Sequence, residues 1–452
     1  MDSGASVTQG CARGEMPDRD RPTAGARTWL LVMLGIATGL DSSATTTRAQ
    51  ETTAPAQPEE PAEQDWASVI GKLRQQVYQR PGHPATRKQL AIAHNNYGLQ
   101  LAGQGQLAQA VLELQEALEI DPTEPGFAQN LAQLHLRIAQ QAYAEGHEPT
   151  ARQAIERAVA VNPKQASAYA LLGQIEYNVQ RLKEARRAWE TAMQLDPTLP
   201  NLKAQLDRVV AELPVESKFE RLSQVWFDIR YTERLERPAG FDIRDTLLRA
   251  RREIGGDFQS WPKQKLVVLV YSAEQFHQLR QDTPEWVAGQ FDGKIRVPLP
   301  DKNLDKAAVT GILFHEYTHA LVHQLTDNRC PLWFNEGLAE YERWKGQEPA
   351  WRTLRPALAA GALLPWDALT SQFSTAASQV EVSLAYEQAH SIVHYLIERY
   401  GFWRIRQLLK AFANGSPPET VMPAQLHVKW PKLQEQWETW LRERTKIPAP
   451  RR

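Results

Sequence analysis

The chain lacks several features that would assign it quickly to a common class. Its 52 Lys and Arg residues nearly balance 53 Asp and Glu residues, which gives a net charge of −1 over 452 residues. No basic cluster with interleaved aromatic residues occurs either, and this argues against a general nucleic-acid-binding role. Cysteine is scarce, with only Cys11 and Cys330. We expect Cys11 to be removed with a leader, so the mature chain can form no intramolecular disulfide, and Cys330 is interpreted as a packing residue.

Long apolar runs are also few. The run near the N-terminus, Trp29 to Leu40, is too short to span a membrane comfortably. Arg19, Arg21 and Arg27 precede it, and Thr47-Arg48-Ala49 offers small residues for cleavage. This pattern predicts a signal peptide over residues 1–49 and an exported protein, either periplasmic or secreted. Met16 is an alternative start. An uncleaved anchor is the alternative interpretation, and only then would the chain contact a membrane.

The next part of the chain combines a linker and an internal repeat. Residues 50–65 are rich in Pro, Ala, Thr and Glu, which predicts a disordered linker. Within residues 66–213, helix-ending prolines at Pro122, Pro163 and Pro197 lie 41 and 34 residues apart (163 − 122 and 197 − 163). The second spacing equals the tetratricopeptide period, and the seven extra residues of the first correspond to about two helical turns.

Small residues recur at the positions where paired helices of such a repeat approach closely. These residues are Gly98, Ala110, Ala117, Ala151, Ala158, Gly173, Ala185 and Ala192. The pattern resembles tetratricopeptide repeats, and an apolar stripe from Leu202 to Leu213 predicts a capping helix. An array of this kind presents a groove to a peptide or a partner protein. A spacer or a dimerisation arm is the alternative role.

The most informative segment is Phe314-His315-Glu316-Tyr317-Thr318-His319. Positions four apart lie on one helical face, so His315 and His319 can bind one Zn²⁺ through imidazole nitrogens. Glu316 lies beside His315, where a carboxylate can act as the general base toward water at the metal. His323 continues the stripe, but we do not expect it to bind, because a fourth protein ligand would close the catalytic position.

A second segment, Trp333-Phe334-Asn335-Glu336-Gly337-Leu338-Ala339-Glu340, completes the candidate site. It follows Cys330-Pro331, a helix-start signal, and places Glu336 and Glu340 four residues apart on one face. Glu336 is a suitable third ligand, which predicts one zinc ion per chain with one open coordination position. In the alternative interpretation, His315 and His319 are hydrogen-bonded core residues and Glu336 is a surface acid.

These two segments resemble the gluzincin metallopeptidases, the class that includes thermolysin and the zinc aminopeptidases. The resemblance implies that His315, His319 and Glu336 are the zinc ligands. Glu316 would be the base, and Glu340 would accept a hydrogen bond from a ligating imidazole. Glu336 follows His319 by 17 residues (336 − 319), slightly fewer than in the aminopeptidases, which a shorter loop explains. The amine-binding motif of the aminopeptidases is absent, which favours an endopeptidase.

A nearer resemblance is to bacterial proteins with a compact peptidase-MA-like domain behind tetratricopeptide repeats. It extends from Val267 to about Tyr400 and includes residues 286–298, which predict a β-hairpin with a two-residue turn at Asp292-Gly293. Gluzincins bind the substrate backbone along a strand edge beside the metal helix. The resemblance implies that this edge is formed by Lys294, Ile295, Arg296 and Val297. An ordinary covered edge strand is the alternative.

The resemblance also includes Ala385-Tyr386-Glu387-Gln388-Ala389-His390. We expect a helix to begin at Tyr386, with Tyr386, His390 and His394 on one face. A gluzincin needs a donor that stabilises the oxyanion of the tetrahedral intermediate, and the resemblance implies Tyr386 first and His390 second. For each of them, a buried structural hydrogen bond is the alternative.

The expected fold is mostly α. An N-terminal tetratricopeptide-repeat α-solenoid precedes an α+β gluzincin-like metallopeptidase domain over residues 214–446, with a small sheet and two zinc-binding helices. The expected function is hydrolysis of a peptide or protein substrate by zinc-activated water with Glu316 as base, while the repeats recruit a substrate or partner. The alternative is a repeat-based interaction scaffold with an inactive, structural zinc domain. The presence of Glu316 favours the enzyme.

Overall fold

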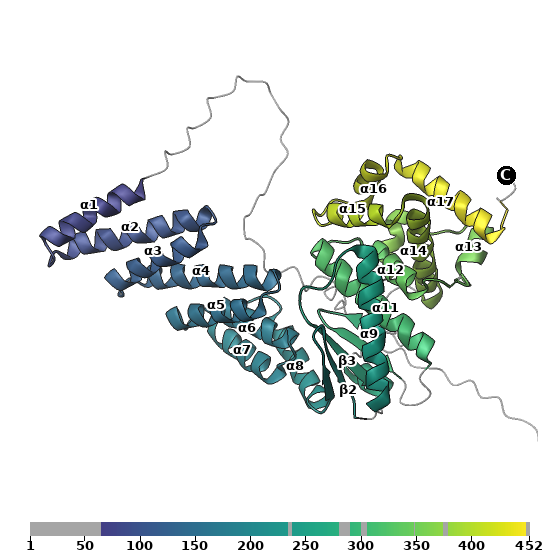
Figure 1. The fold of residues 1–452 in the computed structure, drawn as a ribbon, viewed down its shortest axis with the longest axis horizontal. Coiled ribbons are helices and arrows are strands. Elements are labelled where there is room, and N and C mark those ends of the chain that lie inside the picture. The colour runs from purple at the N-terminus through teal and green to yellow at the C-terminus, as the bar shows by residue number, and fades with distance from the viewer. Residues whose placement is uncertain are drawn as a thin grey trace, which may run out of the picture. The chain divides into compact units, whose positions relative to one another are not determined.

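The computed structural model describes residues 65–233, 237–279, 290–299, 305–347, 349–373 and 378–448. The predicted signal peptide and nearly all of the predicted linker lie outside these residues. The described residues are mostly helical and contain one small mixed sheet, which confirms the expected fold class (Figure 1). Among them, no helix combines the length and the apolar character that crossing a bilayer requires.

Eight helices precede the sheet, and consecutive ones pack in pairs. Their bounds are α1 (Trp66–Gln79), α2 (Pro84–Gly103), α3 (Leu107–Ile120), α4 (Pro125–Ala144), α5 (Glu148–Val161), α6 (Ala166–Asn178), α7 (Leu182–Leu195) and α8 (Leu202–Glu216). The closest packing is within α2–α3, α4–α5 and α6–α7. These pairs are the three repeat units, α1 precedes them, and α8 is the cap.

The unequal spacing of the repeats has a simple origin. The second helix of each unit has 14 residues in α3, α5 and α7 alike. The first helix has 20 residues in α2 and α4 but 13 in α6. The seven extra residues of the earlier units (20 − 13) therefore lengthen only the first helix of the pair, by about two turns.

Two glycines show how closely the paired helices approach. A Cβ at Gly173 would lie 2.3 Å from Cδ1 of Trp189, whose indole nitrogen donates a hydrogen bond to the carbonyl of Ala170. A Cβ at Gly98 would lie 2.8 Å from Cγ of Leu114. Since real Cβ atoms do not make such contacts, these positions need glycine for packing rather than for backbone flexibility.

The sheet has five strands in the order β1-β2-β3-β5-β4. Their bounds are β1 (Glu220–Ser223), β2 (Phe227–Tyr231), β3 (Leu266–Ser272), β4 (Gln290–Phe291) and β5 (Ile295–Leu299). The central pairs β2–β3 and β3–β5 are parallel, and the outer pairs β1–β2 and β4–β5 are antiparallel. A parallel pair needs a crossover, which α9 (Arg237–Phe258) provides between β2 and β3.

The second domain builds its core on one face of this sheet. Ile229, Val268 and Val297 are fully buried there against α9 and α11 (Lys306–Thr326). The remaining helices follow α11 or lie on the other face: α10 (Ala273–Leu279), α12 (Leu332–Arg343), α13 (Leu354–Ala360), the 3₁₀ helix η1 (Trp366–Phe373), α14 (Gln379–Tyr400), α15 (Phe402–Phe412), α16 (Pro418–Leu426) and α17 (Trp430–Thr445). The core thus places α11 directly beside β5.

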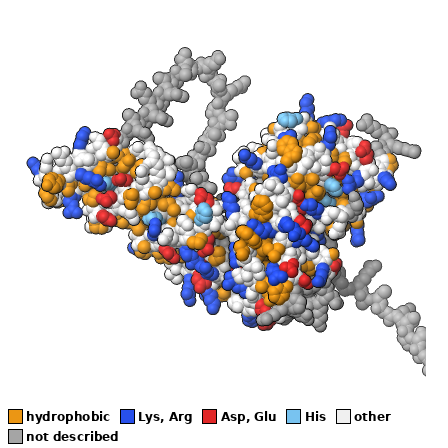
Figure 2. Space-filling model, in the orientation of Figure 1, with side chains coloured by type: hydrophobic (Ala, Val, Ile, Leu, Met, Phe, Trp, Pro, Cys, Tyr) orange, Lys and Arg blue, Asp and Glu red, His pale blue; other side chains and the backbone are white. Residues whose placement is uncertain are grey.

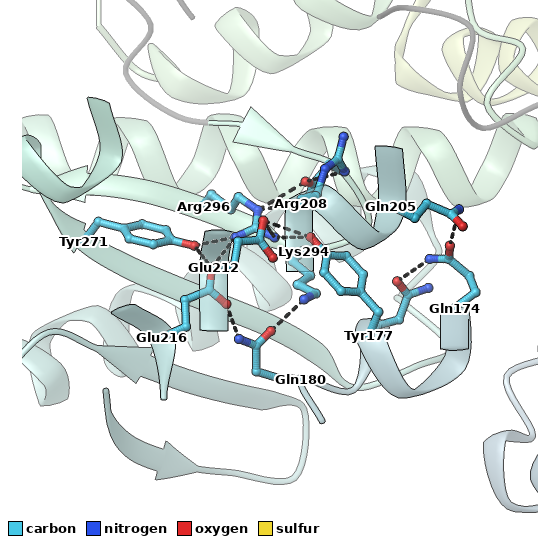
Figure 3. Close-up of polar contacts among 12 residues, drawn as sticks. Gln174, Tyr177, Gln180, Gln205, Arg208, Glu212, Glu216, Tyr271, Lys294 and Arg296 are labelled. Carbon is cyan, nitrogen blue, oxygen red and sulfur yellow. Dashed lines mark hydrogen bonds and ion pairs between the residues drawn. The ribbon is translucent and has the colours of Figure 1, made fainter. Parts of the chain in front are cut away.

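The other face of the sheet is polar near β5 and is covered by the end of the repeat array. Lys294 and Arg296 are both 0% exposed there. They contact side chains from α6, α8 and the residues that follow α6 (Figure 3). We call this cluster the joint; it comprises Tyr177, Gln180, Glu212, Glu216, Tyr271, Asp292, Lys294 and Arg296.

The joint corrects the prediction for the segment from Lys294 to Val297. Ile295 and Arg296 are not at the edge of the sheet, because β4 pairs outside β5 at these two residues. Strand alternation directs Ile295 and Val297 into the core and Lys294 and Arg296 toward the repeats. The outermost strand is therefore β4. The predicted strand residues 286–289 lie outside the described residues.

Two local predictions also need correction. The turn of the β4–β5 hairpin has three residues, 292–294, and Gly293 adopts φ +96° in it. Helix α14 begins at Gln379, seven residues before the predicted start at Tyr386. A capping box formed by Ser378 and Glu381 explains the earlier start, since each side chain hydrogen-bonds the other residue's backbone N–H.

Candidate metal centre

Helix α11 carries the first two candidate ligands in the interior of the domain. Asp305 caps its N-terminus by accepting a hydrogen bond from the backbone N–H of Ala307 at 2.9 Å. The residues from Leu313 to Val322 are all buried, so the helix is covered on every side where the ligands lie. The histidines therefore have packed surroundings, as a rigid metal site requires.

Three donor atoms converge between α11 and α12. The Nε2 atoms of His315 and His319 lie 3.0 Å apart. Oε2 of Glu336 lies 3.5 Å from each of these nitrogens. All three donor atoms are within 4.8 Å of one another, and among the described residues this is the one cluster of at least three such side chains with that geometry. The structure thus brings the three predicted ligands together.

Helix α12 owes its position to one glycine of the second motif. A Cβ at Gly337 would lie 2.6 Å from the carbonyl oxygen of Ala389 on α14. Only glycine allows the two helices to approach this closely. Because Glu336 is the neighbouring residue, this contact also determines where its carboxylate meets α11.

The ring nitrogens that face away from the cluster have their own partners. Nδ1 of His315 lies 2.9 Å from Oε1 of Glu340, the acid expected to orient it. Nδ1 of His319 lies 3.0 Å from Oδ1 of Asn335. These contacts fix each ring so that Nε2 points at Glu336. The sequence analysis assigned no role to Asn335, although its place directly before Glu336 was a usable signal.

Glu340 is itself held in place by its own helix. Arg343 donates to Oε1 at 3.2 Å, and the indole N–H of Trp344 donates to Oε2 at 2.8 Å. These hydrogen bonds and His315 lower the pKa of Glu340 to about 2 against the effect of burial, which alone would raise it. The acid is therefore ionised and fixed at neutral pH.

The pKa shifts of the donors indicate surroundings that favour positive charge. Burial alone would lower the pKa of His315, but hydrogen bonds to Glu336 and Glu340 outweigh it and raise the pKa to about 10. Burial would also lower the pKa of His319, but the charge of Glu336 outweighs this effect and the pKa is raised. Burial would raise the pKa of Glu336, yet the two imidazoles bring it well below its usual range. Protons and a metal cation would compete for these donors.

Glu316 has the surroundings expected of a base rather than of a ligand. It is 3% exposed, and its Oε2 is buried with no hydrogen-bond partner among the described residues. Burial raises its pKa above the usual value, although the neighbouring histidines act in the opposite direction. This oxygen is therefore available to a ligand or to water at the donor cluster.

These observations fit a zinc ion. Two imidazole Nε2 atoms and one carboxylate oxygen form the donor set of a catalytic zinc site. The orienting contacts from Glu340 and Asn335 leave both Nε2 atoms directed at one point. The third observation is the unpartnered oxygen of Glu316 beside them.

The two candidate oxyanion donors lie on α14 in different surroundings. Tyr386 is half-buried, and the centroid of its ring lies 5.0 Å from that of Phe373. Burial raises its pKa well above the usual value, and the charges of Glu336, Glu340 and Glu316 add to this, which places the phenol near the cluster. His390 is 4% exposed and packs among other rings, including Trp351 and His394, while burial lowers its pKa to about 4.

The motif around Tyr386 also has a clear structural role. Glu387 accepts hydrogen bonds from the backbone N–H groups of Arg352, Thr353 and Leu354 at the start of α13. Gln388 donates to and accepts from the backbone of Leu364. These two side chains hold the segment that leads to η1 against α14, and so place Phe373 beside Tyr386. The sequence analysis assigned neither residue a role.

Two further residues take the places expected of them. His323 lies beyond the donor cluster, and the centroid of its ring lies 5.6 Å from that of Phe291 on β4. Cys330 is half-buried against the core of the domain, where burial raises its pKa. Neither is part of the donor set.

Comparison with known protein families gives a match for the part of the chain that contains the donor cluster. Residues 262–443 match the sequence model of the Peptidase MA superfamily. This region contains both zinc-motif helices, which supports a peptidase-like domain. No curated protein matches the chain.

Similar solved structures are found for the helical part. The first TPR of Spaghetti (RPAP3) bound to an HSP90 peptide is 23% identical, with coverage of 28% of this chain and 95% of that chain and a TM-score of 0.22. The first TPR domain of human RPAP3 is 22% identical, with 28% and 94% coverage and a TM-score of 0.21. A MamA RS-1 double mutant is 23% identical, with 32% and 73% coverage and a TM-score of 0.21. Because these TM-scores are low, the assignment of the repeats rests on the packed helix pairs of this chain and not on the similar structures.

Proposed function

We propose that this chain is a zinc-dependent metallopeptidase. The observation that carries the proposal is the convergence of His315, His319 and Glu336 within 4.8 Å of one another, beside the buried, unpartnered oxygen of Glu316. The match of residues 262–443 to the Peptidase MA superfamily supports the same reaction class. The bound zinc would supply Lewis acidity toward water and the scissile carbonyl.

The residues of the chain have distinct tasks in this proposal. His315, His319 and Glu336 hold the cation, and Glu340 and Asn335 keep the imidazoles in the ligating tautomer. Glu316 takes a proton from water at Oε2 and passes it to the amine that leaves. Burial raises the pKa of Glu316, which favours its acceptance of the proton. Tyr386 donates its phenolic proton in a hydrogen bond to the oxyanion.

We further propose that the repeats recruit a protein substrate or partner. Asn95 on α2 and Asn130 on α4 connect two successive units, since Nδ2 of Asn130 donates to Oδ1 of Asn95 at 2.8 Å. Such side-chain amides on the first helices of successive units offer hydrogen bonds to an extended peptide. An endopeptidase is favoured over an aminopeptidase, and export to the periplasm or beyond follows from the predicted signal peptide.

Metal analysis tests the site without a known substrate. We expect residues 50–452, purified with zinc present, to contain about one zinc per chain by elemental analysis. The double variant His315→Ala, His319→Ala and the single variant Glu336→Ala should lose it. The control Lys203→Ala, at an exposed residue of α8 outside the donor cluster, should retain the zinc. Absence of zinc in the wild-type chain after metal-replete purification would contradict the proposal.

Hydrolysis is then tested on a mixture of internally quenched peptides of random sequence. Glu316→Gln should retain zinc but lose activity by about 100-fold or more, because the amide cannot accept the water proton. Retained hydrolysis in this zinc-loaded variant would exclude Glu316 as the base. Zinc binding without hydrolysis in the wild-type chain on any peptide or on unfolded protein would favour the structural role instead.

A further inference from the structure

The joint places a single guanidinium among three carboxylates. The Nε of Arg296 lies 3.1 Å from Asp292, its Nη1 lies 2.9 Å from Glu216, and its Nη2 lies 3.1 Å from Glu212 (Figure 3). Two of these acids belong to α8 of the repeat array, and the third is in the β4–β5 turn. Tyr177 and Tyr271 also contact the guanidinium through their hydroxyl groups. One side chain thus binds the repeats and the hairpin at once.

Two further residues of the β4–β5 turn, Asp292 and Lys294, also contact the repeats. Arg208 on α8 forms an ion pair with Asp292 at 3.5 Å. Lys294 in the same turn donates to Oε1 of Gln180 at 2.6 Å and lies 3.4 Å above the ring of Tyr177. Figure 3 shows Tyr177, Gln180, Arg208 and Lys294 reaching into one cluster. The turn of the hairpin is therefore held from the repeat side at both of its charged residues.

The hairpin in turn lies against the metal-bearing helix. Both β4 and β5 pack on α11. The ring of Phe291 on β4 contacts His323, one turn beyond the ligand His319. Among the described strands β4 is the outermost of the sheet, the position at which an extended peptide can add to a sheet. The position of β4 beside the metal centre thus depends on a turn that α8 holds.

We propose that Arg296, supported by Arg208, is a positioning residue through which the repeat array sets the place of the β4–β5 hairpin beside the metal centre. The inference rests on the proposed peptidase function in one respect, that β4 serves as the substrate edge. It makes the repeats a part of the substrate site rather than a separate recruiting arm. Movement of α8 would then change how β4 receives a peptide.

Hydrogen exchange on residues 50–452 tests this inference without a substrate. In Arg208→Ala, we expect backbone amides of residues 290–299 to exchange about fivefold faster, as the loss of a partly exposed ion pair predicts. Arg208→Lys should restore much of the protection. Lys203→Ala, which breaks an exposed ion pair on the same helix, should leave these amides unchanged. Amides of α17, far along the chain, should exchange alike in every variant.

The stronger variant Arg296→Met should increase exchange of the hairpin on the order of 100-fold, because it leaves buried carboxylates without a partner. Zinc content should remain at the wild-type level in Arg208→Ala. Unchanged hairpin exchange in both Arg208→Ala and a folded Arg296→Met would overturn the inference. Equal increases in α17 and the hairpin would also overturn it, since they would indicate general destabilisation.

Kinetics separate this inference from the proposed function. With a peptide that the wild-type chain cleaves, Arg208→Ala should raise KM by about fivefold while kcat changes little, because binding at the edge and not the chemical step is affected. If the wild-type chain cleaves no peptide, the proposed function fails while hydrogen exchange still decides whether the repeats position the hairpin.

Discussion

The joint and the metal centre are both clusters of charged side chains that are shielded from water. In the joint, the basic groups Lys294 and Arg296 lie among acids from α8 and the hairpin turn. In the metal centre, three glutamates surround two histidines, and Oε2 of Glu316 has no hydrogen-bond partner among the described residues. The guanidinium of Arg296 meets carboxylates of the chain itself on three sides, whereas the candidate metal centre brings together three donors that fit an added cation.

This difference distinguishes the joint from the candidate metal centre. Buried opposite charges that satisfy each other specify how two parts of a chain meet. Buried donors that converge on one point from rigid helices are costly unless something binds between them. Elsewhere the surface gives no such contrast, since basic and acidic side chains are interspersed over the face drawn in Figure 2.

Removal of the central charge of each cluster should have opposite consequences. Arg296→Met should lower the unfolding free energy by about 3–5 kcal/mol, because Glu212 and Glu216 remain buried without their cation. His319→Ala should cost the metal-free protein less, since His315 remains 3.5 Å from Glu336 and still pairs with it. Denaturant unfolding of metal-free protein measures both. A larger loss in His319→Ala would reverse the comparison.

Added metal should stabilise only through the metal centre. Zinc at about 100 times its dissociation constant should raise the unfolding free energy by about 2.7 kcal/mol, because it binds the folded donors alone. A chelator should remove this gain, and thermal unfolding with and without chelator measures it. His315→Ala should abolish the zinc-dependent shift, whereas Arg208→Ala should retain it. A shift of equal size in both variants would show that zinc binds elsewhere.

The joint should show its own dependence on pH through Lys294. Burial lowers the pKa of Lys294 to about 7, from 10.5 in an exposed chain. Between these values the unfolded chain binds a proton that the folded chain has released. The unfolding free energy therefore rises with pH across this window, by up to about 1.4 kcal/mol per unit, and the contribution is least favourable below about pH 7.

Lys294→Met is the variant that measures this contribution. Its unfolding free energy relative to wild type should be highest near pH 6.5 and should decline toward about pH 9.5, as the wild-type chain gains stability. Denaturant unfolding at several pH values gives the difference. The groups that face Lys294 and also titrate or carry charge are Tyr177, Glu212, Glu216, Asp292 and Arg296. A constant difference across this range would exclude Lys294 as the titrating group.

The smallest effect is expected at the periphery of the metal centre. Trp344→Phe removes the hydrogen bond from the indole N–H to Oε2 of Glu340 but keeps an aromatic ring. Glu340 would then orient His315 less firmly, and zinc affinity should fall by about tenfold. A competition titration with a fluorescent chelator measures this. Trp403→Phe, at an exposed tryptophan on α15, is the matched control and should leave affinity unchanged.

The features that could be predicted from the sequence are those that neighbouring residues determine. The fourfold spacing of His315 and His319 places them on one helical face in any α-helix. The glycines and alanines of the repeats marked helix pairs because close approach needs a small residue at a fixed place in each unit. The early start of α14 was also local, since Ser378 and Glu381 form a recognisable capping box. These features need no knowledge of distant contacts.

The main misprediction, the sheet edge, depends on contacts between distant residues. The segment from Lys294 to Val297 was predicted as a strand, but which strand lies outside it and which face meets the repeats depend on residues far away. Glu212 and Glu216 precede Arg296 by about 80 residues and had no pattern that linked them to it. The contact of Asn335 with His319 and that of Glu387 with α13 likewise arise only when helices pack.

The sequence by itself determined the helical repeats, the two motif helices and the three donor types, because periodicity and turn chemistry act within a few residues. The tertiary structure decided that the donors converge on one point, that β4 and not β5 is the outermost strand, and that the polar face of β5 binds the repeats. The physical reason is that a buried charge is tolerated only beside its partner. The location of that partner is a property of the packed chain.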